Sequence, residues 1–372
     1  MVIIIRAKDI ESDSRVLKYI HFLREKEINY QIISWDRING SSYDENTIDF
    51  NYKSLYNEGG WSAVKGRLKW MYFVIKTLRR IVTDDKTVLH ACDLDAAFPA
   101  VVFKTMFCRG VKVIFDIFDW FSATLSNQNH LIRRSFTLME RFCIRHSDYI
   151  IICEKERQNQ IPYYINKDRL FILPNIPSFI NKEFLHLDKE LCFDNNLITL
   201  AYVGGFTTDR CLDELISIAE TGTINLLIAG FGDSRLEERL SQLNLKNIKY
   251  FGKVQYERGL NIMYNADIIY AMYSKINPNH YFAAPNKYYE AMFLGKPIIS
   301  TSGINMDSKI KSDNIGYITN EGQESINECF QSITRSDLID KGLNSAKLWE
   351  SKYKTYTIDF LTTQYLKLIT SK

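Results

Sequence analysis

A short stretch in the last third of the chain carries residue types that bind an anion. It runs Pro285-Asn286-Lys287, and Glu290 follows three residues later. A proline at the first helical position starts a helix without cost, because its missing N–H has no partner there. The free N–H groups of Asn286 and Lys287, the helix dipole and the Lys287 ammonium would together bind a diphosphate. Glu290 would then accept hydrogen bonds from vicinal hydroxyls such as those of a ribose. Alternatively, Pro285 is only an ordinary first residue of a helix, and Glu290 is only a solvated helix residue.

A second segment joins a glycine pair to an arginine. Gly204 and Gly205 follow the apolar run 198–203, and Arg210 comes soon afterwards. Glycines let a backbone approach a ligand closely, and a guanidinium forks onto phosphate oxygens. Tight turns also use glycine pairs, so this segment gains its weight from the anion site predicted at 285–290.

The first half of the chain offers a histidine and four carboxylates at the ends of apolar runs: His90, Asp93, Asp95, Asp116 and Asp119. We expect His90 and Asp93 to line an acceptor-side site. Asp93 and Asp95 share a strand face and could hold Mg or Mn, or cap the next helix. For Asp116 and Asp119 an acceptor-side role and helix capping are equally open. We expect no metal, because Arg210 and Lys287 already supply positive charge.

These segments lie in a chain that alternates strand and helix patterns, which predicts α/β architecture with parallel sheets covered on both faces. Two prolines near 174–178 interrupt the alternation. We therefore expect two Rossmann-like domains, at 1–178 and 190–350, with a C-terminal helix at about 352–372 packing back on the first. Ligands of such sheets bind beyond the carboxyl ends of the strands. The strand runs are 2–6, 30–34, 87–91, 111–116, 149–153, 198–203, 224–229, 247–251, 267–272, 297–300 and 316–318.

The order and spacing of these segments resemble the family 4 glycosyltransferases. The matching residues are Gly204-Gly205 and Arg210, Ala229-Gly230-x-Gly232, Phe251-Gly252-Lys253-Val254, Ala266-Asp267, Pro285-Asn286-Lys287, Glu290-Ala291-Met292 and Gly295-Lys296-Pro297, with 89–95 and 115–119 in the first half. The resemblance implies the GT-B fold, in which two Rossmann-like domains face each other across a cleft. It also implies a retaining transfer of a sugar from a nucleotide-diphosphate donor.

The resemblance assigns roles position by position. Arg210 and Lys287 would hold the donor diphosphate and stabilise its departure, so we place them with His90 and Asp93 as catalytic residues. Glu290 would bind the ribose. The remaining donor-binding positions are Gly204, Gly205, Lys253 and Val254 (the last two at the nucleobase), Pro285 and Asn286. Two positions depart from the family: Phe282 replaces the first glutamate of the paired motif, and Cys92 replaces a histidine.

The stretch 61–82 predicts an amphipathic helix without acids. Its apolar stripe is Val64, Leu68, Met71, Ile75, Leu78 and Val82. A basic, aromatic helix suits an anionic membrane surface, and a sheet-covering helix with a solvated flank is the alternative. A second basic run, at Arg133, Arg134, Arg141 and Arg145, favours the membrane. The residues predicted to contact it are Trp61, Lys65, Arg67, Lys69, Trp70, Lys76, Arg79 and Arg80.

Composition bounds the partners and the compartment. With 47 Lys and Arg against 44 Asp and Glu, the chain is too balanced for a general nucleic-acid binder. Its seven scattered cysteines fit a reducing compartment rather than zinc or disulfides. We therefore expect a cytoplasmic enzyme, peripheral at the inner face of the cell membrane. It would move a hexose or N-acetylhexosamine from a UDP-sugar to a lipid-linked acceptor of a surface polysaccharide such as a capsule or O-antigen, without a metal or other cofactor. A soluble acceptor, or a non-catalytic nucleotide-sugar-binding subunit, is the alternative.

Overall fold

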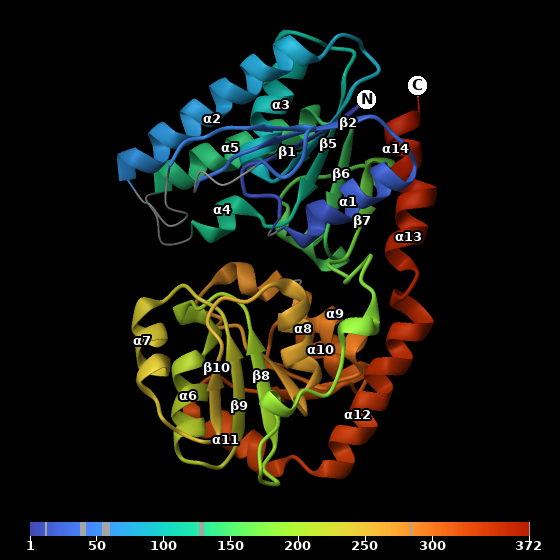
Figure 1. Cartoon of the computed structure of the whole chain (residues 1–372). Coiled ribbons are helices and arrows are strands. Elements are labelled where there is room, and N and C mark those ends of the chain that lie inside the picture. Colours follow the sequence, from blue (N-terminus) through green and yellow to red (C-terminus); the bar gives the residue numbers. More distant parts are fainter. Residues whose placement is uncertain (12, 38–41, 54–59, 126–129, 283–284, 372) are drawn as a thin grey trace. The chain divides into compact units, whose positions relative to one another are not determined.

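The β-branched apolar runs form the strands of two parallel sheets in the computed structural model (Figure 1). The structure describes residues 1–11, 13–37, 42–53, 60–125, 130–282 and 285–371. The first sheet has the order β3-β2-β1-β4-β5-β6-β7. Its strands are β1 (Val2–Arg6), β2 (Tyr30–Ser34), β3 (Thr47–Asp49), β4 (Val88–Cys92), β5 (Lys112–Ile117), β6 (Tyr149–Ile152) and β7 (Leu170–Ile172).

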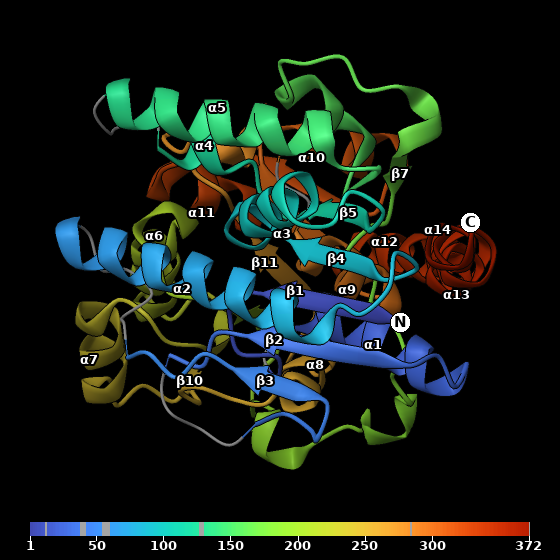
Figure 2. The ribbon, with the colours of Figure 1, turned by 90° about the horizontal axis from the view of Figure 1, so that it is seen from above.

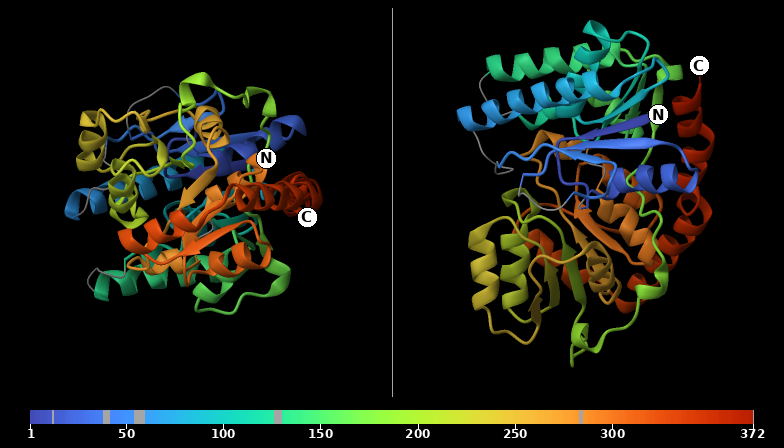
Figure 3. Two further views of the ribbon diagram at one scale, coloured as in Figure 1. Left: turned by 90° about the horizontal axis from the view of Figure 1, so that it is seen from below. Right: turned by 45° about the horizontal axis from the view of Figure 1, so that its top comes forward.

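Helices cover both faces of this first sheet, which is why its central strands are apolar on both sides. Helices α2, α3 and α5 lie side by side on one face (Figure 2). Helix α1 and the C-terminal segment cover the other face, and they lie next to each other in Figures 1 and 3. The helices are α1 (Ser14–Glu25), α2 (Gly60–Ile81), α3 (Leu94–Met106), α4 (Phe121–Thr124), α5 (His130–His146), α13 (Tyr356–Phe360) and α14 (Leu366–Thr370).

The second sheet repeats this plan with the order β10-β9-β8-β11-β12-β13. Its strands are β8 (Thr199–Val203), β9 (Asn225–Ala229), β10 (Ile248–Tyr250), β11 (Ile268–Ala271), β12 (Ile298–Thr301) and β13 (Gly316–Thr319). Helices α6, α7 and α11 pack on one face, and α8, α9 and α10 pack on the other. The remaining bounds are α6 (Leu212–Glu220), α7 (Ser234–Gln242), α8 (Tyr256–Tyr264), α9 (Asn286–Leu294), α10 (Asn305–Ser312), α11 (Gln323–Ser332) and α12 (Arg335–Leu348).

The chain divides into two compact units, each built on one of these sheets. Unit 1 comprises Met1–Pro174 and Thr357–Lys372, and unit 2 comprises Asn175–Tyr356. Every predicted strand run corresponds to an observed strand, with ends that differ by at most one residue. The short edge strands β3 and β7 were not predicted. Each has three residues and is defined by its pairing, with β2 and β6 respectively.

Candidate functional site

The glycines of unit 2 bring three strand ends together at the carboxyl edge of the sheet. Gly204 follows β8, next to the point where the strand order changes direction between β8 and β11. A Cβ atom at Gly230, after β9, would lie 1.9 Å from the Gly204 carbonyl oxygen. The Gly230 N–H also donates to the Gly252 carbonyl oxygen, after β10, at 2.8 Å. Only glycine at position 230 allows this close approach, and such a switch point is where doubly wound sheets bind ligands.

Helix α9 begins beside this edge and supplies a cation. Pro285 is the residue before the first helical one, so the prediction of Pro285 at the first helical position was off by one residue. Its missing N–H is still not needed there. The Lys287 Nζ atom lies 2.8 Å from the place where a Gly204 Cβ would stand, and 4.7 Å from the centre of the Tyr202 ring. Burial lowers the pKa of Lys287 to about 8, with Arg210 adding to the shift and Glu290 opposing it.

Arg210, just before α6, is held by two side chains from the segment after β11. Its Nη1 lies 2.7 Å from His280 Nε2, and its guanidinium carbon lies 4.5 Å from the centre of the Tyr273 ring. His280 Nδ1 lies 2.9 Å from the Ser274 carbonyl oxygen, which can only accept. In the neutral tautomer that donates from Nδ1, His280 Nε2 accepts from the guanidinium. His280 is buried, so it fixes the direction in which Arg210 points.

Glu290 lies one turn into α9 and is buried. Its Oε1 accepts a hydrogen bond of 3.0 Å from the Tyr256 hydroxyl. Burial raises the pKa of Glu290, and Lys287 and the Tyr256 hydroxyl oppose that rise. A carboxylate oxygen accepts hydrogen bonds, so Glu290 offers an acceptor for a hydroxyl of a ligand.

Lys253 and Val254 follow β10 along the same edge. The Lys253 Nζ lies 5.1 Å from the centre of the Phe231 ring, which is half exposed between Gly230 and Gly232. An exposed aromatic ring beside a cation is a surface on which a nucleobase can stack. The predicted donor-binding residues of unit 2 therefore follow one edge of one sheet.

The sequence did not predict the side chains that orient these groups: Tyr202, Phe231, Tyr256, Tyr273 and His280. Among these five side chains, the sequence pattern indicated only Tyr202 as a neighbour of the glycine pair. Side chains alternate along a strand, so Tyr202 shares a strand face with Gly204. Phe282, which departs from the pattern of the family 4 resemblance, ends the short helix Pro278–Phe282 and is partly buried.

In unit 1 the structure places His90 inside the protein rather than at a surface. Its side chain is fully buried on β4, its Nδ1 lies 2.8 Å from the Tyr365 hydroxyl, and its Nε2 lies 3.5 Å from Asp116 Oδ2. Its ring also packs edge-on against Tyr19, at 4.3 Å between centres. A ligand cannot reach His90 in this arrangement, so direct contact with an acceptor does not fit the structure. His90 instead connects β4 to the C-terminal segment, and Cys92 is buried beside it.

Asp93 and Asp95 each interact with an arginine and do not converge on one point. Asp93 follows β4, binds Arg6 and accepts from the Phe118 N–H at 2.9 Å. Its backbone begins α3, but its side chain makes no capping hydrogen bond. An Asp95 carboxylate oxygen lies 3.3 Å from Arg67 Nε. The partners of these two carboxylates thus favour neither a shared metal nor side-chain capping.

Asp116 is a buried ion-pair residue, so the two predicted roles, at an acceptor or at a helix cap, are both wrong. Arg15 donates to both of its oxygens, at 2.7 and 3.2 Å, and the Tyr19 hydroxyl donates to Oδ2 at 2.7 Å. Arg15 and His90 hold the pKa of Asp116 well below its usual range despite burial. Asp116, His90 and Cys92 have ligand atoms within 4.8 Å of one another. However, the buried Arg15 already uses both carboxylate oxygens and would repel a cation. Asp119 pairs with Arg157 at 2.9 Å.

Helix α2 buries a different face from the predicted stripe. Trp70 is fully buried, stacks on Trp35 and donates from Nε1 to the Asp95 carbonyl oxygen at 2.9 Å, so its predicted membrane contact is wrong. Arg67 is half-buried beside Asp95. Of the predicted stripe, Leu78 is buried, whereas Val64 and Leu68 are exposed. The exposed basic residues are Lys65, Lys69, Lys76, Arg79 and Arg80. The side chain of Trp61 lies outside the described residues.

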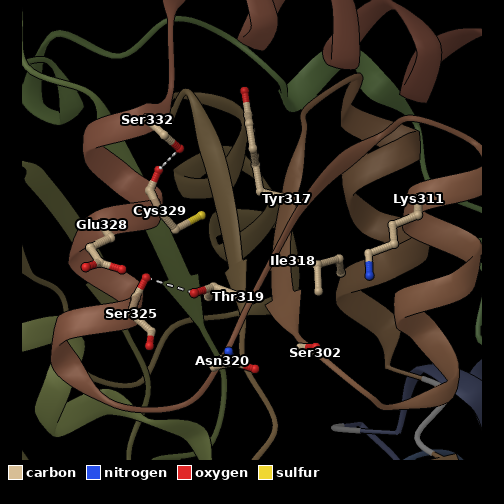
Figure 4. A pocket seen from close by; sticks show the side chains of 10 residues that line it. All are labelled: Ser302, Lys311, Tyr317, Ile318, Thr319, Asn320, Ser325, Glu328, Cys329 and Ser332. Atoms are coloured by element: carbon tan, nitrogen blue, oxygen red, sulfur yellow. Dashed lines mark hydrogen bonds between the residues drawn. The ribbon is translucent and has the colours of Figure 1, made fainter.

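A pocket of about 440 Å³ lies elsewhere on unit 2, between β13, α10 and α11 (Figure 4). Ser302, Lys311, Tyr317 and Cys329 are among its lining residues. Figure 4 shows the Lys311 and Tyr317 side chains on opposite sides of Ile318. None of the predicted donor-binding residues lines it, so we do not assign it to the donor.

Part of unit 2 is similar to a known protein family. Residues 198–334 match the family model of glycosyl transferases group 1, a span that holds the whole carboxyl edge described above. No curated protein matches the chain in sequence.

Solved structures resemble the chain over its full length. Sucrose-phosphate synthase from Thermosynechococcus elongatus matches with a TM-score of 0.73 at 14% identity, covering 99% of this chain and 98% of that one. HepE from Anabaena, in complex with UDP-glucose, matches with a TM-score of 0.69 at 12% identity, covering 98% and 99%. WaaG, a glycosyltransferase involved in lipopolysaccharide biosynthesis, matches with a TM-score of 0.68 at 12% identity, covering 100% of both chains. The fold is GT-B, and the matched domain together with the fold supports a glycosyltransferase of the GT-B type.

Proposed function

We propose that the chain is a retaining glycosyltransferase that uses a UDP-sugar, with a hexosyl or N-acetylhexosaminyl group, and acts on a lipid-linked acceptor in the synthesis of a bacterial surface polysaccharide. The observation that carries the proposal is the position of Arg210, Lys287 and Glu290 along one sheet edge. Two cations match a diphosphate, and a buried carboxylate matches the hydroxyls of a ribose. HepE, which shares the fold, was solved with UDP-glucose, and this supports the uridine base.

The proposed reaction breaks the bond between the anomeric carbon and the diphosphate oxygen and forms a bond from that carbon to the acceptor oxygen on the same face. The acceptor proton passes to the departing diphosphate. Arg210 and Lys287 stabilise the charge that develops on that diphosphate, which is a large part of catalysis in such a reaction. The proposal therefore requires no enzymic nucleophile and no metal. In unit 1, Asp93 is the acceptor-side candidate, and the buried His90 connects β4 to the C-terminal segment through Tyr365.

A screen of nucleotide sugars tests this proposal. The full chain is titrated with UDP-, GDP- and ADP-sugars by thermal shift, and each binder is then assayed for sugar release to water and for transfer to lipid-linked acceptors. We expect UDP-sugars to raise the melting temperature most and to be turned over. Binding without turnover would identify a non-catalytic nucleotide-sugar-binding subunit, and transfer only to a soluble sugar would contradict the lipid-linked acceptor.

We further propose that unit 1 docks on an anionic membrane through the outer faces of α2 and α5, here called the basic helix pair. Exposed apolar side chains lie on both helices: Val64, Leu68, Tyr72, Leu131, Ile132 and Leu138. Exposed arginines and lysines lie among them, at the α2 positions given above and at Arg133, Arg134, Arg141 and Arg145. The one acid on either helix, Glu140, is buried and accepts from the Ser122 N–H at 2.8 Å. Apolar side chains amid basic charge suit attachment to anionic lipid headgroups. No described helix combines the length and apolar character needed to cross a membrane.

Co-sedimentation with phosphatidylglycerol vesicles tests the basic helix pair. Each basic residue near an anionic surface contributes about 1 kcal/mol, so Gln at the five exposed basic positions of α2 should strongly weaken sedimentation, although the four arginines of α5 remain. Leu68→Ala should weaken it, whereas the equally exposed Leu343→Ala on α12 should not. Salt at 1 M, where the Debye length is about 3 Å, should release the wild type. Undiminished sedimentation of the Gln variant would show that α2 is only a sheet-covering helix.

A further inference from the structure

Tyr202 is a buried strand residue with contacts to several groups of the proposed donor site. It lies on β8, two residues before Gly204, and is 1% exposed. Its ring packs among Phe206 and Tyr270 in the core of unit 2, with centres 6.1 and 6.3 Å away. Core packing alone would be satisfied by phenylalanine. The hydroxyl and one ring face are what point to a further role.

The Tyr202 hydroxyl holds a peptide group of the glycine pair. It donates to the Gly205 carbonyl oxygen at 2.6 Å. The N–H of that same peptide group, from Phe206, donates to the Phe231 carbonyl oxygen at 2.8 Å. The peptide is therefore fixed at both ends, although Gly205 is exposed and has open space where a Cβ would stand. Glycine has more backbone freedom than any other residue, so these two bonds restrict the conformation of the glycine pair that lies beside the Lys287 ammonium.

The Tyr202 ring provides a contact for the ammonium of Lys287. The Nζ atom lies 4.7 Å from the ring centre, a distance at which the negative face of an aromatic ring attracts a cation. Lysine has a flexible four-carbon stem, and without such a contact its charge would occupy many positions. The Gly204 backbone leaves room for this ammonium, because a Cβ there would come within 2.8 Å of it.

We propose that Tyr202 is a positioning residue of the diphosphate site, whose hydroxyl fixes the Gly205 peptide and whose ring holds the Lys287 ammonium. The Lys287 ammonium and the glycine turn beside it are thereby oriented before the ligand binds, and this reduces the ordering that binding requires. The inference rests on the proposed function, since it concerns the same diphosphate.

Two substitutions separate the two contacts, and a third controls for loss of packing. Tyr202→Phe removes only the hydroxyl, and Tyr202→Leu removes the ring as well. Tyr270→Phe is the matched control, because Tyr270 is equally buried on the neighbouring strand and its hydroxyl donates to the Cys211 carbonyl oxygen at 2.8 Å. The full-length variants are titrated with UDP by calorimetry from pH 7 to 9, and their melting temperatures are measured.

We expect Tyr202→Phe to weaken UDP binding about three- to tenfold, because the hydroxyl loses its hydrogen bond to the Gly205 carbonyl oxygen and its interaction with Arg210, while Tyr270→Phe binds UDP as the wild type does. Tyr202→Leu should weaken binding further. It should also move the alkaline loss of affinity to lower pH, because the ring no longer stabilises the charged form of Lys287. A purely structural role for Tyr202 would lower the melting temperature without moving this pH midpoint.

The possible failures are distinguishable. Wild-type UDP affinity in both Tyr202 variants would overturn the inference and leave the donor site standing, provided that Arg210→Ala still loses affinity. Equal losses of affinity in Tyr202→Phe and Tyr270→Phe would overturn it as well, since the effect would then be general destabilisation. A wild-type chain that does not bind UDP would overturn the proposed function itself.

Discussion

Lys287 should make UDP binding fall between pH 7 and pH 9. Its pKa is lowered to about 8, mainly by burial, whereas an ordinary lysine stays charged across this range. The diphosphate is already ionised above pH 7. The protein side of the interaction is therefore the part that titrates.

The size of the effect follows from the fraction of charged Lys287. With a pKa of about 8, roughly nine-tenths of the side chains are charged at pH 7 and roughly one-tenth at pH 9. If only the charged form binds, affinity falls about tenfold over these two pH units, or about 1.4 kcal/mol. Binding at pH 9 must then take up about 0.9 proton per UDP, because the bound diphosphate restores the charge of Lys287.

Calorimetry in two buffers of different ionisation enthalpy measures both quantities on the same samples. Lys287→Arg is the matched control, because a guanidinium stays charged at pH 9 and should bind UDP with no pH dependence and no proton uptake. A wild-type affinity that is constant from pH 7 to 9 would refute the reasoning, and so would the same decline in Lys287→Arg.

Three further predictions follow from the described contacts. Arg210→Ala and Glu290→Ala should each weaken UDP binding about ten- to a hundredfold, because each removes a charged hydrogen-bond partner. The control variant Arg235→Ala removes only an exposed ion pair with Asp213 and should not weaken binding. Wild-type affinity in both Arg210→Ala and Glu290→Ala would refute the site. Asp116→Asn should cost about 3–5 kcal/mol in denaturant unfolding at pH 7, because it leaves Arg15 without its buried counter-charge. Asp119→Asn should cost far less, because Asp119 is exposed. The folded pKa of Asp116 lies below its unfolded value, so the stability that Asp116 contributes should be lost as pH falls below about 4. Equal costs in Asp116→Asn and Asp119→Asn would contradict this prediction. Transfer activity should survive EDTA, and full loss that Mg or Mn restores would overturn the metal-independent mechanism.

The sequence predicted the sheets well because their strands are continuous apolar runs between helical patterns. It missed β3 and β7 because three residues at a sheet edge carry no periodic pattern of their own. The donor-binding residues were found because glycines, a proline and charges follow each other closely in the chain. The side chains that orient them were not found from the sequence. His280, for example, contacts Arg210 only after folding brings together two residues that are 70 positions apart in the chain.

The error in α2 has a physical cause. The helix carries apolar residues around most of its circumference, so more than one stripe fits helical spacing. Trp35 decides which one is buried, because it stacks on Trp70 at 5.7 Å. Asp116 was misjudged for a related reason: a buried carboxylate is recognisable only when its partner is known, and Arg15 lies 101 residues away in the chain.

A crystal structure of the full chain with UDP tests the central claim most directly. The account predicts the diphosphate in contact with Arg210 and Lys287, a ribose hydroxyl within hydrogen-bond distance of Glu290, and uracil beside Lys253 and Val254. UDP bound elsewhere, for example in the pocket between β13 and α11, with Arg210 and Lys287 free of phosphate contacts, would contradict it.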